Sequence, residues 1–134
     1  MAMGHTIKLA ALGAVAFMVL DGVWLGVLMK DFYRDQLAPI VRLANGGIAP
    51  NWPAALVVYA LLGAGIAIFV IPRAATVALA AAYGALFGMV VYGVYDFTNY
   101  STLRQWPFVL TLADVAWGAV ASAASAVAVW IVAR

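Results

Sequence analysis

The chain has 134 residues, of which 68% are hydrophobic and 9% charged, and its mean hydropathy is +1.07. A soluble domain has roughly 45–50% apolar and roughly 25% charged residues, so this composition excludes a water-soluble globular protein. The net charge of +2 is too small and too scattered for a nucleic-acid-binding surface, and no nucleic-acid partner is expected. The absence of cysteine excludes disulfides and thiolate chemistry.

Four apolar stretches are long enough to cross a bilayer, which takes about 20 residues per helix. They leave no room for a soluble domain, so we predict an all-α, integral membrane four-helix bundle that forms a single transmembrane domain over residues 1–134. An even number of spans places both termini on the same side of the membrane. The predicted spans are about 7–29, 54–71, 74–97 and 107–132.

The connections between these spans differ in length. Residues 31–52 are rich in turn-forming residues and make the longest connection, and the apolar spacing over 32–43 favours a short helix along the membrane interface. The turn at Pro72 and Arg73 is very short, which predicts that the second and third helices are antiparallel neighbours.

Three of the five aspartates lie inside or at the edge of apolar spans. An ionised carboxylate costs at least roughly 2.5–3.5 kcal/mol at mid-membrane, so such residues are functional candidates by default. Asp21 and Asp114 lie at similar distances from the same membrane face, roughly 12 Å inside it at 1.5 Å per residue, and Asp96 lies nearer that face. All three acids therefore belong to one half of the bilayer.

The first and fourth spans share the pattern Asp-x-x-Trp, as Asp21 with Trp24 and Asp114 with Trp117. A spacing of three places each tryptophan on the helix face of its aspartate. An indole N–H can donate a hydrogen bond to a carboxyl, and the ring can form the wall of a pocket. The same pattern is also compatible with a packing device that holds each aspartate protonated across the bundle.

In the third span, Tyr92 and Asp96 lie on one helix face, with Tyr95 and Asn99 beside them. Small-residue pairs Gly22-x-x-x-Gly26 and Gly84-x-x-x-Gly88 favour close packing of the first, third and fourth helices. These helices would enclose a polar, aromatic ligand-binding pocket. Its predicted lining residues are Asp21, Trp24, Tyr92, Tyr95, Asp96, Asn99, Asp114 and Trp117.

No cofactor and no metal are predicted. Haem or zinc would need more than the single His5, which lies outside the spans, and the low density of acids disfavours Mg²⁺ or Ca²⁺. The three aspartates also have a purely structural interpretation, as buried acids kept neutral by desolvation.

The motif Tyr95-Asp96-Phe97-Thr98-Asn99, followed by Asp114-x-x-Trp117-Gly118, resembles a family of small bacterial membrane proteins known only as a domain of unknown function. Asp21 with Trp24, Phe32-Tyr33 and Asn51-Trp52-Pro53 fit the same pattern, so the resemblance covers nearly the whole chain. It implies a four-span, multi-pass protein of the bacterial inner membrane and no established activity.

Four functions remain open. The first is an accessory membrane protein that binds a lipid-like or small hydrophobic ligand in the acidic, aromatic pocket, with membrane lipid as its partner. The second is a structural subunit of a larger membrane complex or a homo-oligomer, and the third is a lipid-modifying enzyme with an intramembrane aspartate as general acid or base, although no catalytic residue can be assigned. The fourth, a proton or cation pathway, is disfavoured because the acids occupy only half of the bilayer.

Overall fold

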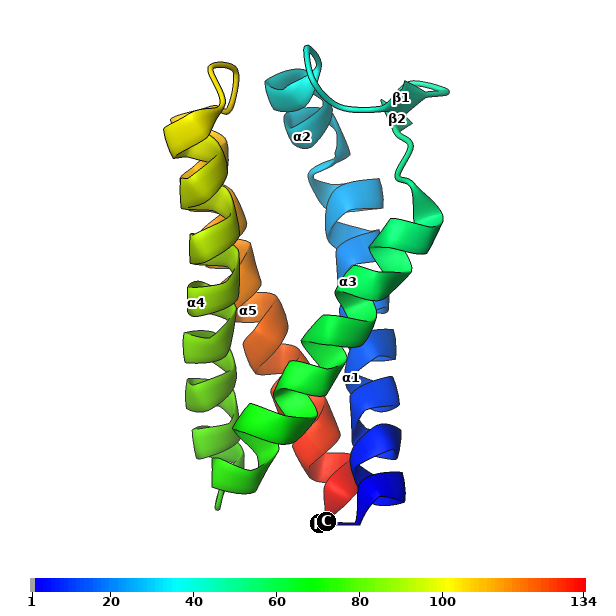
Figure 1. Cartoon of the computed structure of the whole chain (residues 1–134), viewed down its shortest axis with the longest axis vertical. Coiled ribbons are helices and arrows are strands. Elements are labelled where there is room, and N and C mark those ends of the chain that lie inside the picture. The colour runs from blue at the N-terminus through cyan, green and yellow to red at the C-terminus, as the bar shows by residue number, and fades with distance from the viewer. Residues whose placement is uncertain (1) are drawn as a thin grey trace.

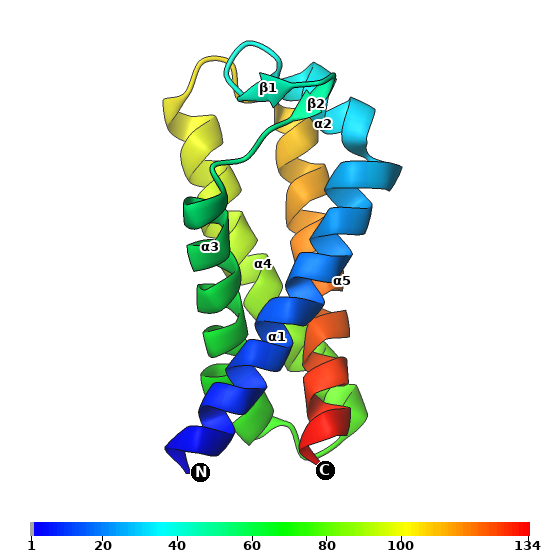
Figure 2. The same cartoon turned by 90° about the vertical axis from the view of Figure 1, so that its right-hand side faces the viewer.

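The computed structural model describes residues 2–134 and contains four helices that are long and apolar enough to cross a membrane. The predicted four-helix bundle is confirmed, and each helix begins or ends a few residues away from the predicted bound. The two ends of the chain lie at the same end of the bundle (Figures 1 and 2). The four spans are Met3–Leu28, Trp52–Arg73, Val77–Thr102 and Phe108–Ala133.

The first span consists of α1 (Met3–Val23) and a π-helical turn, η1 (Trp24–Leu28), closed by the bond from the Met29 N–H to the Trp24 carbonyl. A short helix, α2 (Lys30–Leu37), follows within the stretch predicted to lie along the interface. The connection then forms a two-stranded antiparallel hairpin, β1 (Leu43–Ala44) with β2 (Gly47–Ile48). The positive φ angles of 53° at Asn45 and 77° at Gly46 suit its tight turn.

The second span contains α3 (Trp52–Gly65), a π-helical turn, η2 (Ile66–Val70), and a 3₁₀ turn, η3 (Ile71–Arg73). The Asn51 side chain accepts a hydrogen bond from the Ala54 N–H and caps α3. The Thr76 hydroxyl caps α4 (Val77–Thr102) in the same way, and α5 (Phe108–Ala133) begins after Pro107. The α4–α5 connection, α2 and the hairpin gather at one end of the bundle, called here the loop end (Figure 1).

The prediction that the second and third helices are neighbours holds only near their short turn. A side-chain β-carbon at Gly88 or Gly84 would collide with the backbone of α5, so α4 packs closely along α5. In the same way Gly63 lets α3 approach α1 at Ala10 and Ala14. These two close pairs pull α3 and α4 apart, and the two helices diverge toward the loop end (Figure 1).

Of the two glycine pairs predicted to pack helices, one is confirmed and the other is wrong. Gly84 and Gly88 fit against α5, near Ser122 and Gly118. A β-carbon at Gly22 or Gly26 would meet nothing within 4 Å, so this pair faces away from the bundle. The first helix uses Gly13 instead, whose β-carbon would lie 3.1 Å from the Gly63 α-carbon.

Candidate functional site

Asp21 accepts two hydrogen bonds from other helices. The Trp117 indole N–H of α5 donates to its Oδ1 over 2.7 Å, and the Tyr59 hydroxyl of α3 donates to its Oδ2 over 3.1 Å. A carboxyl in an apolar span needs such donors, because a buried polar group without partners is costly. Asp21 therefore joins the first, second and fourth spans at one point.

Asp114 is bonded by a residue outside the spans. The Tyr33 hydroxyl of α2 donates to Asp114 Oδ1 over 2.7 Å and accepts from the Trp24 indole N–H over 2.9 Å. Tyr33 is only 4% exposed, and burial, together with the nearby Asp114 carboxyl, raises its pKa above the ordinary value of 10.0. The hydroxyl therefore stays protonated and remains a donor to Asp114. Within residues 2–134, no N–H or hydroxyl group donates to Asp114 Oδ2, and the Asp96 carboxyl is the other polar group that interacts with this acid.

The two Asp-x-x-Trp patterns meet face to face. The Trp24 and Trp117 rings stack with centroids 4.4 Å apart and an interplanar angle of 1°. Each indole is linked by hydrogen bonds to the aspartate of the other helix. Trp117 donates to Asp21 directly, and Trp24 donates to the Tyr33 hydroxyl, which in turn donates to Asp114. The repeat thus bonds across the bundle and not along its own helix.

Asp96 is fully buried, and neither of its carboxyl oxygens has a hydrogen-bond partner in the described chain. From the contact of Gly88 with Gly118, Asp96 lies about two turns and Asp114 about one turn toward the loop end. The sequence-based order of depth is therefore supported. Side chains lean toward the N-terminus of their own helix, so the two carboxyls of these antiparallel helices approach each other and interact electrostatically.

A cavity of about 400 Å³ lies between these acids and the apolar helix faces. Asp21 and Asp114 form part of its wall, together with five aromatic side chains, and aliphatic residues form the rest. Its lining residues are Asp21, Leu25, Tyr33, Leu37, Val41, Ile48, Val58, Leu62, Val91, Tyr92, Tyr95, Trp106, Leu110, Asp114 and Trp117.

A second hollow, a groove of about 800 Å³, lies at the loop end. It shares Leu37, Val41, Ile48, Tyr95 and Trp106 with the cavity, so the two hollows adjoin along a common wall. The groove adds polar side chains that the cavity lacks. These are Arg42, Asn99, Arg104 and Gln105.

The predicted site residues are therefore distributed over three positions. Five of them line the cavity, namely Asp21, Tyr92, Tyr95, Asp114 and Trp117. Asn99 lines the groove, where it is joined again by Tyr95. Trp24 lies behind Trp117 in the stack, and Asp96 lies buried beside Asp114, so neither is among the lining residues.

Sequence reasoning missed two tyrosines as members of the site. Tyr33 lies in a connection, and the only signal for it was its place in the family-like pattern. Tyr59 is a single hydroxyl in a stretch of Ala, Val and Leu, with no pattern to mark it. The sequence indicates that the two buried aspartates need hydrogen-bond donors, but it does not identify Tyr33 and Tyr59 as those donors.

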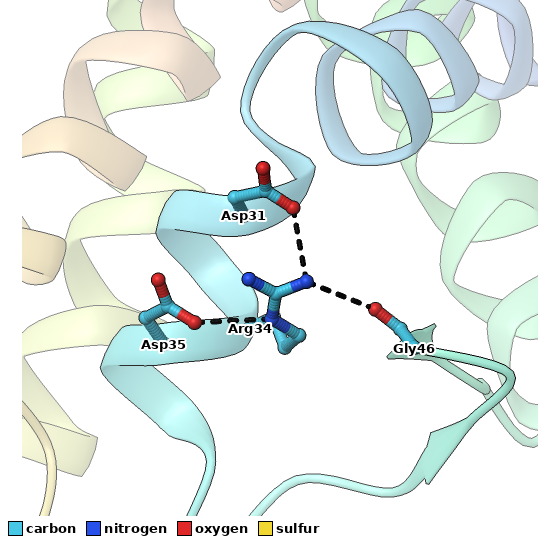
Figure 3. A network of polar contacts seen from close by, with 4 residues as sticks. All are labelled: Asp31, Arg34, Asp35 and Gly46. Carbon is cyan, nitrogen blue, oxygen red and sulfur yellow. Dashed lines mark hydrogen bonds and ion pairs between the residues drawn. The ribbon is translucent and has the colours of Figure 1, made fainter.

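Arg34 of α2 links two parts of the long connection (Figure 3). Its guanidinium lies 3.0 Å from both Asp31 and Asp35, and it donates to the Gly46 carbonyl over 3.2 Å. The hairpin is thereby tied to α2, and its residue Ile48 reaches the wall shared by the two hollows. Figure 2 shows the hairpin running across the end of the bundle.

The chemistry available in the cavity is that of hydrogen-bond acceptance and proton transfer. Asp114 Oδ2 can accept a hydrogen bond from a hydroxyl or amine, and the aliphatic wall favours an apolar group beside it. Across residues 2–134, no group of three or more His, Cys, Asp or Glu residues is placed to hold a metal ion.

Comparison with known proteins gives one match. Residues 6–131 match a family described as "Predicted membrane protein (DUF2177)". No curated protein and no solved structure gives a significant match to the chain.

Proposed function

Because the chain belongs to this family of predicted membrane proteins, whose description names no activity, we propose a function from the geometry of the cavity. The protein binds a lipid-like molecule within the membrane and acts as an accessory membrane protein. A hydroxyl or amine of the ligand donates a hydrogen bond to Asp114, and its apolar part lies against the aliphatic wall.

One observation carries the proposal: a cavity inside the span region has both an apolar wall and a carboxyl oxygen that accepts from no N–H or hydroxyl group of residues 2–134. The Tyr33 hydroxyl donates to Asp114 Oδ1, while no N–H or hydroxyl group of residues 2–134 donates to Oδ2. Asp21, in contrast, has both of its carboxyl oxygens bonded by protein donors. The spare acceptor beside an unfilled apolar volume fits an amphiphile with one polar group.

The divergence of α3 and α4 gives such a ligand a route from the bilayer. Val58 and Leu62 of α3 line one side of the cavity, and Val91 and Tyr95 of α4 line another. The two helices approach each other only near η2, where a β-carbon at Gly65 would collide with the Phe87 ring. Val58 and Val91 are both exposed, so the cavity reaches the surface between α3 and α4, and a ligand can enter there without crossing the polar connections.

The test is lipid retention by the Asp114→Asn variant. Wild-type and variant protein are transferred from vesicles of phosphatidylethanolamine and phosphatidylglycerol into detergent, and retained lipids are counted by native mass spectrometry. We expect the variant to retain about tenfold less lipid, because an amide accepts a weaker hydrogen bond than a carboxylate. Asparagine still offers Tyr33 an acceptor, so the bundle should elute normally in size-exclusion chromatography.

Asp35→Asn is the matched control, since Asp35 is exposed at the surface of α2 and removing its charge leaves Arg34 paired with Asp31. It should retain lipid like the wild type. Equal retention by the Asp114→Asn variant and the wild type would contradict the proposal, as would a wild-type protein that retains no lipid at all.

The membrane in question is proposed to be the bacterial inner membrane. Its support is the helical form of all four spans, because proteins of the bacterial outer membrane are typically closed β-barrels.

A further inference from the structure

The groove at the loop end is rich in hydrogen-bond donors and positive charge. Arg42 comes from the long connection and Arg104 from the α4–α5 connection, and both are exposed and line the groove. The Asn99 and Gln105 amides add further donors. The groove wall contains no acidic side chain.

Neither arginine forms an ion pair with an acid in the described part of the chain. The acids nearest to the groove in the connection, Asp31 and Asp35, both pair with Arg34. Among residues 2–134, no ion pair involves Arg42 or Arg104. Two guanidinium groups on opposite connections are thus free to bind an anion, and guanidinium groups bind phosphate oxygens through paired N–H donors.

The wall between groove and cavity carries a further unused donor. The Trp106 indole N–H is buried without an acceptor in the described chain, and its ring packs edge-on against Tyr95 at 5.7 Å. Both residues line the two hollows. An oxygen-rich group placed at this wall would supply the missing acceptor after a small rotation of the indole.

The position of the groove identifies the kind of anion. It lies where the spans end, at the level of lipid headgroups, directly above a cavity that opens sideways between α3 and α4. Basic residues at the end of a membrane span attract anionic lipids electrostatically. A soluble anion would need only the groove, whereas a phospholipid occupies the groove and the adjoining apolar volume together.

Resting on the proposed function, we propose that the ligand is an anionic phospholipid whose phosphate lies in the groove between Arg42 and Arg104. Its acyl chains leave through the gap between α3 and α4, and the hydroxyl-bearing part of its headgroup reaches toward Asp114. A single phospholipid would then contact the free arginines, the spare carboxyl oxygen and the wall shared by the two hollows.

The experiment measures headgroup preference. Wild type and the double variant R42Q/R104Q are exchanged against vesicles of equal parts phosphatidylglycerol and phosphatidylcholine, and native mass spectrometry compares the two retained lipids. The wild type should retain more phosphatidylglycerol than phosphatidylcholine. The ratio of these two retained lipids should be about tenfold lower in the double variant, as expected for the loss of two interfacial arginines. The double variant R73Q/R134Q removes the same charge at the opposite end of the bundle and should keep the preference.

Four outcomes overturn the assignment. The arginine site is refuted if the wild type retains lipid without headgroup preference, or if the R42Q/R104Q variant keeps the wild-type preference for phosphatidylglycerol. Either result leaves the proposal of a lipid-binding cavity in place. Displacement of phosphatidylglycerol by inorganic phosphate would show that phosphate alone is recognised. Absence of any retained lipid in the wild type refutes the proposed function itself.

Discussion

Tyr33 connects two tryptophan–aspartate patterns that are far apart in the chain. Its hydroxyl accepts from Trp24 and donates to Asp114. Because the group is buried next to a carboxyl, ionisation is disfavoured and its pKa is raised. The sequence predicted the aspartates and their indole neighbours, but it could not predict this bridge, since residues 81 positions apart are brought together only by folding.

The Tyr33→Phe variant should therefore be less stable at neutral pH by about 2 kcal/mol, because it loses two hydrogen bonds that usually contribute about 1 kcal/mol each. A raised pKa in the folded state stabilises the fold below the ordinary tyrosine value of 10.0, and this contribution declines as the pH rises beyond it. The difference between wild type and variant should thus narrow above about pH 10. Unfolding in detergent, followed by circular dichroism across this pH range, measures both effects.

Tyr83→Phe provides the control, because Tyr83 is 38% exposed and makes no hydrogen bond in the described chain. It should leave stability unchanged at every pH. A Tyr33→Phe variant as stable as the wild type at neutral pH would show that the bridge is not needed.

Among the helices, α4 and α5 form the closest pair, and glycine is the reason. Gly88 lies against the Gly118 backbone and the Ser122 hydroxyl, and Gly118 lies under the Tyr92 ring. This contact sets the register that places Asp96 near Asp114. The Gly84-x-x-x-Gly88 pattern predicted such packing, whereas the identical pattern at Gly22 faces outward. A small-residue pattern therefore indicates that a helix face can pack closely, but it does not identify the helix that packs against it.

Gly88→Ala should destabilise the protein by about 1–3 kcal/mol, because the added methyl group collides with the backbone of α5 and the helices must separate. Gly93→Ala is the matched control on the same helix, since a β-carbon there meets nothing within 4 Å. Denaturation midpoints in detergent would compare the two variants. A midpoint for Gly88→Ala equal to that for Gly93→Ala would mean that the helices are packed less tightly than described.

At the scale of the whole molecule, two tight helix pairs leave an opening between them. α1 packs on α3 and α4 packs on α5, while α3 and α4 diverge toward the loop end (Figure 1). Val58 of α3 and Val91 of α4 line the cavity and are exposed, so the cavity reaches the surface between these helices. Residues of the long connection line its other end.

Filling the opening should block the ligand. Val58 is 51% exposed and lines the cavity, so Val58→Trp would place an indole in the path between α3 and α4. We expect severalfold less retained phosphatidylglycerol by native mass spectrometry. Val57→Trp adds the same bulk at a position that is 58% exposed and outside the cavity wall, and it should retain lipid normally. Equal retention in both variants would place the route elsewhere.

The sequence by itself determined the membrane class, the four helices and the presence of aspartates in one half of the bilayer. These features depend on composition and on distances along a single helix, which are local properties of the chain. Only the tertiary structure decided which indole is bonded to which aspartate, and that Tyr33 and Tyr59 are the other donors. It also decided that α3 and α4 diverge and that the cavity lies between them. Such features depend on which helix faces meet, and many different pairings satisfy the same local pattern of apolar and small residues.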